Sequence, residues 1–186
     1  MASLHSLPAL REEGVLHVVV ESPRGSTSKI RYDPQLQVFV LSRPLPLGLA
    51  YPHDWGFVPG TIAEDGDPLD ALVLSEGTTY PGLVLTARAI GTVAVEQDSK
   101  TAPRGPDGRP KRERNDRVIA VPIPAPRASW GRPEDLPARV RQEIEQFFVN
   151  ITVLEGKNIS ILGWRSPEDT MALIASKMRA PATKAQ

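Results

Sequence analysis

Nineteen prolines divide this chain of 186 residues into short segments, and that division constrains its fold more than any other feature of the sequence. The prolines fall between short runs of β-branched and apolar residues and within one long polar segment. Because proline has no backbone N–H and a fixed φ angle, it interrupts regular structure and favours turns. The pattern predicts a β-rich fold with turns at the prolines, not a disordered chain.

Short β-type runs follow one another over most of the chain. Two of them, residues 29–32 and 35–41, are expected to form a hairpin around Asp33-Pro34. Gly91 predicts a bend or bulge inside the longest run. The predicted strands are residues 15–20, 29–32, 35–41, 71–74, 83–96, 118–121 and 159–164.

Two helices are predicted near the C-terminal end. Apolar residues that include Leu136, Ile144 and Phe148 recur at helical spacing over residues 134–150. Ser166, followed by proline and two acids, is typical of a helix N-terminus, and this helix is expected to run to about residue 179. Short strands followed by two helices predict an α+β fold, in which the helices pack against a small closed β-barrel.

Residues 97–116 differ in character from the rest of the chain. They are rich in glycine, proline and basic residues and contain almost no apolar side chains. This composition predicts a flexible loop inserted between two strands. No internal repeat or second domain is visible, so residues 1–186 are expected to form a single domain.

Composition and charge restrict the function classes. The chain has no cysteine, which excludes disulfides, thiolate catalysis and thiolate zinc sites. Its 22 basic and 22 acidic residues balance to a formal net charge of zero, which argues against a dedicated nucleic-acid-binding protein. No apolar run approaches the roughly 20 residues of a membrane helix, and the N-terminus lacks the apolar centre of a signal peptide. We therefore expect a cytoplasmic protein without membrane or nucleic-acid partners.

Three carboxylates lie within six residues in the segment Asp65-Gly66-Asp67-Pro68-Leu69-Asp70. They repel one another unless cations or hydrogen bonds compensate their charge. Gly66 allows a sharp turn and Pro68 stiffens it, so the acids are expected to point into one place. Carboxylate oxygens at this density suit a hard cation such as Mg²⁺. A solvated acidic turn is the alternative that composition leaves open.

This acidic turn resembles the signature of the soluble (family I) inorganic pyrophosphatases. The preceding stretch, residues 51–61, matches the adjoining segment of that family. Further matches follow in order, so that the resemblance covers about residues 15–178. They lie at residues 72–73, 81–82, 89–91, 119–122, 147–148 and 163–164.

The resemblance implies a fold and an activity. The fold is a five-stranded, OB-like closed β-barrel flanked by two C-terminal helices, here within one pyrophosphatase-like domain. The activity is the hydrolysis of pyrophosphate to two phosphates with Mg²⁺, usually by a homo-oligomer. Its physical basis is metal-assisted phosphoryl transfer, in which carboxylates hold the metal ions and basic side chains neutralise the phosphate oxygens.

The resemblance also assigns roles to individual residues. Asp65 and Asp70 would bind the activating metal ions, and Asp67 beside them would orient or deprotonate the attacking water. Glu21 matches a further carboxylate near the metal cluster. Three cations match phosphate-binding residues of the family: Lys29, Arg43 and Arg117.

Several positions depart from the family pattern. Arg31 replaces a glutamate, and Trp55 replaces a tyrosine and can donate only through its indole N–H. Gln97 replaces an aspartate, with Asp98 one position later. Losing carboxylates predicts weaker Mg²⁺ binding, because cation affinity follows ligand charge. The remaining departures are an acid replaced by Asn115, a lysine replaced by Arg117, and a tyrosine-lysine pair replaced by Ile151 and Thr152.

Three hypotheses of function follow. The main one is an inorganic diphosphatase that acts on pyrophosphate or a related phosphoanhydride, in which the 97–116 loop supplies replacement groups such as Asp98. The second is a divergent paralogue with little or no hydrolysis that binds a metal or phosphate compound in a regulatory or structural role. Arg31, Trp55 and Ile151 favour it because all three alter the same pocket. The third is an OB-like barrel that binds single-stranded nucleic acid, which leaves the acidic turn unexplained.

Overall fold

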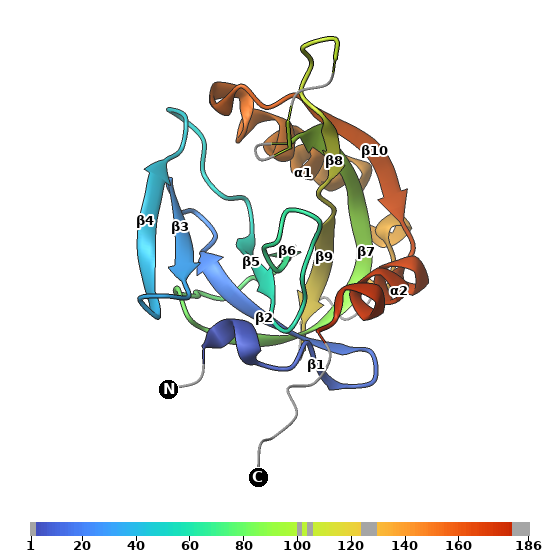
Figure 1. Cartoon of the computed structure of the whole chain (residues 1–186). Coiled ribbons are helices and arrows are strands. Elements are labelled where there is room, and N and C mark those ends of the chain that lie inside the picture. Colours follow the sequence, from blue (N-terminus) through green and yellow to red (C-terminus); the bar gives the residue numbers. More distant parts are fainter. Residues whose placement is uncertain (1–2, 100–101, 104–105, 124–129, 180–186) are drawn as a thin grey trace.

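The computed structural model describes residues 3–99, 102–103, 106–123 and 130–179. It is an α+β structure in which one large mixed sheet carries two C-terminal helices (Figure 1). The helices are α1 (Ala138–Asn150) and α2 (Pro167–Lys177). The strands are β1 (Leu10–Glu12), β2 (Val15–Ser22), β3 (Ser28–Asp33), β4 (Val38–Pro44), β5 (Asp54–Val58), β6 (Leu69–Val73), β7 (Val84–Asp98), β8 (Arg112–Arg114), β9 (Arg117–Pro122) and β10 (Ile159–Arg165).

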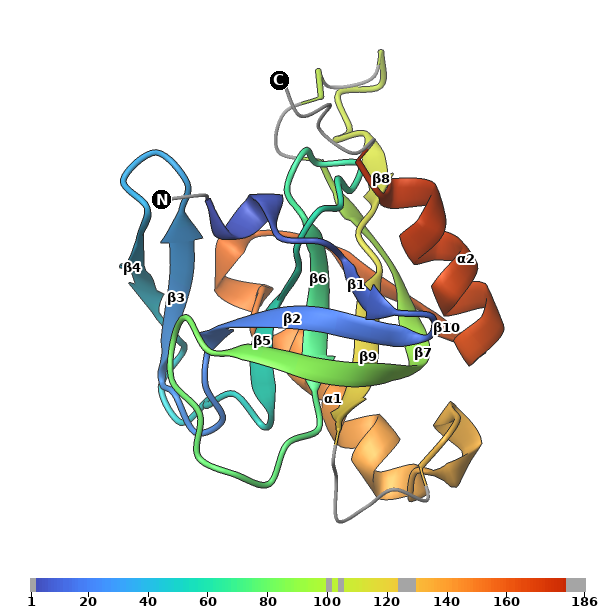
Figure 2. The same ribbon diagram turned by 90° about the horizontal axis from the view of Figure 1, so that it is seen from below.

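The pairings of the large sheet return to the strand from which they start. Strand β2 pairs antiparallel with β5 and with β7, and β5 pairs antiparallel with β6. Strand β6 pairs parallel with β9, and β9 pairs antiparallel with β7. The hairpin β3–β4 forms a separate two-stranded sheet, which stands on the side of the molecule opposite α2 (Figures 1 and 2).

The long strand β7 pairs with four neighbours, because it bends along its length. Its partners are β2, β9, β10 and β8. The register with β9 shifts between Ala89 and Gly91, so the predicted irregularity at Gly91 is confirmed. A Cβ at Gly91 would lie 2.6 Å from Cγ of Pro133 and 2.8 Å from the carbonyl oxygen of Arg165, and glycine allows that close approach.

All the strands and both helices predicted from the sequence are present, but the first helix begins later than expected. It starts at Ala138, and residues 133–135 form a separate 3₁₀ turn. The reason is Pro137, which disfavours helical geometry at the preceding Leu136 and holds it extended. The second helix begins as predicted: the Ser166 hydroxyl oxygen accepts a hydrogen bond from the backbone N–H of Asp169 at 3.1 Å.

The predicted loop at residues 97–116 has strands at both ends. Strand β7 extends to Asp98, and β8 pairs with it antiparallel, with Gln97 opposite Glu113. The short strands β1 and β8, and β5 within the family-like segment, were not predicted. Residues 100–101 and 104–105 of the loop, including Lys100 and Arg104, lie outside the described residues.

The two helices cover different apolar clusters. Ile144, Phe147 and Phe148 of α1 pack with Trp55 and Ile119 in one cluster. Ile174 of α2 belongs to the other, which includes Val18, Ala71 and Val118. Val118 and Ile119 are consecutive in β9, so their side chains point to opposite faces of the sheet and pack into different clusters. Within the described parts of the chain, no helix is long and apolar enough to cross a membrane.

We predict that Gly56→Ala lowers the free energy of unfolding by about 3 kcal/mol, because overpacking against backbone cannot relax easily. A Cβ at Gly56 would lie 1.8 Å from the carbonyl oxygen of Val19 in the neighbouring strand β2. Gly77→Ala is the matched control, since its added methyl group meets no atom within 4 Å. Urea unfolding followed by circular dichroism measures both variants. Equal stabilities would contradict the close packing of β5 on β2.

Candidate functional site

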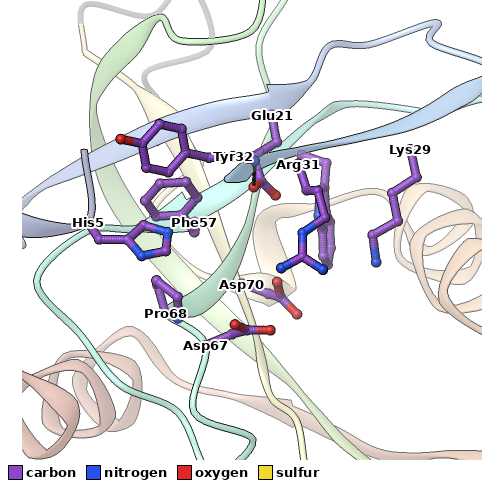
Figure 3. A pocket seen from close by; sticks show the side chains of 10 residues that line it. His5, Glu21, Lys29, Arg31, Tyr32, Phe57, Asp67, Pro68 and Asp70 are labelled. Atoms are coloured by element: carbon purple, nitrogen blue, oxygen red, sulfur yellow. Dashed lines mark hydrogen bonds between the residues drawn. The ribbon is translucent and has the colours of Figure 1, made fainter. Parts of the chain in front are cut away.

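A cavity of about 290 Å³ brings together most of the site residues expected from the sequence. The hairpin, the acidic turn, β9 and the end of α1 all contribute to its walls. Glu21 lies in an adjoining pocket that it shares with Lys29, Asp67 and Asp70. Figure 3 shows Glu21, Asp67 and Asp70 facing this pocket, with Arg31 and Lys29 beside them. The expected residues that line the larger cavity are Lys29, Arg43, Asp65, Asp67, Asp70 and Arg117.

The acidic turn is shaped by its own backbone. Gly66 has a φ of +88°, a conformation that glycine adopts without strain. The backbone N–H of Asp67 donates to Oδ1 of Asp65 at 3.2 Å, and the N–H of Ala63 donates to the carbonyl oxygen of Asp67 at 2.7 Å. Asp70 follows as part of β6. All three carboxylates line the larger cavity.

Glu21 is largely buried and accepts a hydrogen bond from the backbone N–H of Tyr32 at 2.7 Å. Burial, with a smaller contribution from the nearby charge of Asp70, raises the pKa of Glu21 from 4.5 to about 7 against the opposing effect of that hydrogen bond. Burial and the charge of Asp70 also raise the pKa of Asp65. A pocket that raises the pKa of its carboxylates in this way favours a bound cation.

The donor chemistry of the pocket fits a hard cation, but its carboxylates are not gathered into a finished metal site. Carboxylate oxygens are the ligands that Mg²⁺ prefers. Among the residues that the structure describes, no group of three or more His, Cys, Asp or Glu side chains is placed to hold a metal ion. One reason is that the Asp70 carboxylate is already paired with a basic side chain of the protein.

Arg117 lines the larger cavity and is buried. Its guanidinium is paired with Oδ2 of Asp70 and donates to Oδ1 of Asn115. Its Cζ lies 5.3 Å from the centroid of the Trp55 ring, within range of a cation–π interaction. Asp70 and Arg117 are directly opposite in the parallel pairing of β6 with β9, so the sheet register sets this contact.

Arg43 also lines the cavity. It is paired with Glu155 and donates to the carbonyl oxygen of Ile151 at 3.0 Å. The Nζ of Lys157 lies 3.6 Å from the other carboxylate oxygen of Glu155. Glu155 and Lys157 line the cavity, and neither was predicted from the sequence. Their charges just after α1 were the available signal, but isolated charges at a helix end are commonly solvated.

The other departures from the family pattern have distinct environments. Gln97 lines the cavity and is 2% exposed, and its Oε1 has no hydrogen-bond partner among the residues that the structure describes. The Thr152 hydroxyl donates to the carbonyl oxygen of Val149 at 3.1 Å, so it is engaged by α1. Arg31 is exposed at the rim.

The hypothesis that Asp98 replaces the missing acid is wrong. Asp98 is part of strand β7, where its side chain points away from that of Gln97. Its carboxylate pairs with Nη1 of Arg112 at 2.8 Å, and it does not line the cavity. Arg112 pairs with Glu96 as well as with Asp98. One of the basic side chains of the 97–116 loop is therefore already engaged in ion pairs.

Comparisons with known proteins find relatives that match nearly the whole chain. The family model described as inorganic pyrophosphatase matches residues 18–181. A Thermus thermophilus protein named inorganic pyrophosphatase is 41% identical over 170 residues, which cover 89% of this chain and 90% of that protein. A Synechocystis protein of the same name is 35% identical over 172 residues, with coverages of 92% and 94%.

Solved structures give the same result. The crystal structure of the inorganic pyrophosphatase from Thermus thermophilus matches with a TM-score of 0.83 and 36% identity, covering 95% of this chain and 97% of that one. The structure from Neisseria gonorrhoeae matches with a TM-score of 0.81 and 27% identity, with coverages of 94% and 96%.

We predict that Glu21→Gln stabilises the metal-free protein at pH 8. The folded pKa of Glu21 is about 7, above its ordinary 4.5, so ionisation costs folding free energy as the pH rises through this range. At about 1.36 kcal/mol per pKa unit, the difference between 4.5 and about 7 costs roughly 3 kcal/mol at pH 8. Glutamine removes it and can still accept the hydrogen bond from Tyr32.

The measurement is thermal unfolding in EDTA at pH 8 and pH 4. At pH 4 the carboxyl group is largely protonated in both states, so the variant and the wild type should be about equally stable. The same stability difference at both pH values would show that ionisation of Glu21 is not its cause.

Proposed function

This chain belongs to the inorganic pyrophosphatase family, and from that premise we propose how its cavity hydrolyses pyrophosphate to two phosphates. The chain is an inorganic diphosphatase, as its sequence predicted. The mechanism rests on one observation: the acidic turn and three basic side chains line the same cavity. Relatives 35% and 41% identical over most of the chain carry the name of the enzyme, so the alternative of a paralogue without hydrolysis is not favoured.

Mg²⁺ is the cofactor of this proposal. Four carboxylates would hold it, from the acidic turn and from β2. When bound, the ion lowers the pKa of a coordinated water and withdraws charge from the phosphate oxygens. The raised pKa values of two of these carboxylates support a cation here, since a positive charge would offset the cost of their burial. The proposed metal-binding residues are Glu21, Asp65, Asp67 and Asp70.

Asp67 acts as the general base. Its carboxylate lies on the turn between two other acids and faces the cavity. It orients the attacking water and accepts one of its protons as the oxygen attacks a phosphorus atom. The bridging P–O bond then breaks, and the second phosphate leaves with the electron pair.

Three cations bind and neutralise the phosphate groups in this proposal: Lys29, Arg43 and Arg117. They reach the cavity from β3, β4 and β9, so they surround the acidic turn from separate elements. Charge-assisted hydrogen bonds to the phosphate oxygens hold the substrate and stabilise the charge that develops on the leaving group. The Arg43 guanidinium is oriented for this role by Glu155.

We further propose that β2, β5, β6, β9 and β7 form the five-stranded, OB-like closed barrel, since their pairings return to β2. Residues 1–186 would form one domain, which assembles as a homo-oligomer and works in the cytoplasm. Its partner is pyrophosphate rather than a nucleic acid or a membrane. The zero formal net charge supports that choice, because no basic excess is present to attract a polyanion.

We predict that Asp67→Asn lowers phosphate release from pyrophosphate by about 100-fold or more, the effect of losing a general base. The measurement is phosphate release by the purified full chain with Mg²⁺ and, separately, with Mn²⁺. Asp107→Asn is the matched control. The side chain of Asp107 is exposed and accepts a hydrogen bond from the backbone N–H of Arg109, which asparagine can also accept.

The wild type and Asp107→Asn should release phosphate at similar rates. A wild type that releases no more phosphate than Asp67→Asn, with either metal, would overturn the proposed function.

A further inference from the structure

We propose that the guanidinium of Arg117 takes the place of one divalent cation in this cavity, so that the chain binds fewer metal ions than its acidic turn would otherwise hold. The inference rests on the proposed function, because it concerns the same acidic residues. The cavity would then contain two kinds of cation: the guanidinium of Arg117, which is part of the protein, and divalent metal ions that bind beside it.

The first step is that Arg117 is fixed between groups that suit a cation. Its guanidinium contacts a carboxylate oxygen of Asp70 and the amide oxygen of Asn115. The amide nitrogen of Asn115 in turn donates to Oδ2 of Asp65 at 3.4 Å. Arg117 therefore neutralises one carboxylate directly and is linked to a second through Asn115.

The second step is that Arg117 cannot easily move aside. Its side chain is 8% exposed, and the Trp55 ring lies against its guanidinium. Trp55 is itself packed on Phe148 of α1, with ring centroids 6.0 Å apart. A planar guanidinium held by two oxygen acceptors and an aromatic face is pre-organised, unlike an ammonium on a flexible stem.

The third step is the charge of the surrounding residues. Two positions where the resemblance expects acids hold the neutral amides Gln97 and Asn115. The amide of Asn115 gives the buried guanidinium an oxygen acceptor without additional negative charge. An incoming divalent ion would meet fewer anionic ligands and the repulsion of Arg117, and both effects lower its affinity.

The test is to count and titrate Mn²⁺, which accepts the same oxygen ligands as Mg²⁺. The full chain is titrated without pyrophosphate, and free Mn²⁺ is followed by electron paramagnetic resonance. We expect Arg117→Gln to bind one more Mn²⁺ per chain than the wild type, or to bind Mn²⁺ at least about tenfold more tightly. Arg114→Gln is the matched control, since Arg114 pairs with Asp116 outside this cavity, and it should bind Mn²⁺ as the wild type does.

Arg117→Lys is a second variant for the case that Arg117→Gln does not fold, because lysine keeps a positive charge beside Asp70. A lysine ammonium cannot donate to Asp70 and Asn115 while lying flat on Trp55, so an incoming ion should displace it more easily. We expect at least about threefold tighter Mn²⁺ binding, the same direction as for glutamine. If Arg117→Gln does not fold by circular dichroism, Arg117→Lys alone decides.

Unchanged Mn²⁺ number and affinity in the folded variants would overturn the inference. The result is separable from the proposed function, since no substrate is present. A wild type that releases no phosphate would refute the proposed function and leave the metal count valid. An active wild type whose Arg117 variants gain no Mn²⁺ would refute this inference alone.

Discussion

The parallel pairing of β6 with β9 is the interaction on which both the fold and the site depend. It joins the series β2–β5–β6 to the series β2–β7–β9, and without it the two would end at open edges. The same register sets Asp70 opposite Arg117. A slip of one residue would turn Arg117 to the other face of β9 and move its apolar neighbours out of their clusters. Packing and chemistry are therefore fixed by one set of backbone hydrogen bonds.

The site that results differs from a simple cluster of acids. A buried carboxylate is tolerated only with a compensating charge or hydrogen bonds. Asp70 has both from Arg117, and Glu21 has one backbone hydrogen bond and a raised pKa. The charge of Asp70 is therefore already neutralised, whereas the part of the pocket around Glu21 favours an added cation. We infer that this division lets a diphosphatase keep its acidic turn while losing three of the acids that its family pattern contains.

Much of the fold and the site could be predicted because their causes are local. Ser166 caps the helix that follows it, Gly91 marks the irregularity in β7, and Gly66 turns the chain between two acids. The helix start at residue 134 was wrong because the influence of Pro137 on its neighbour was overlooked. The strand β8 was missed because its polar residues become a strand only by pairing with β7, which no local pattern reveals.

The sequence by itself determined most of the strands, both helices, the acidic turn and six of the charged residues that reach the cavity, since these follow from residue type and near neighbours. The tertiary structure decided which charges meet. Asp98 forms an ion pair with Arg112, Arg43 with Glu155, and Arg117 with Asp70. Each of these pairs except Asp98–Arg112 joins residues from distant parts of the chain, and even that pair depends on strand pairing. Electrostatic partners depend on distance in space and on burial, and both exist only once the sheet has set its register.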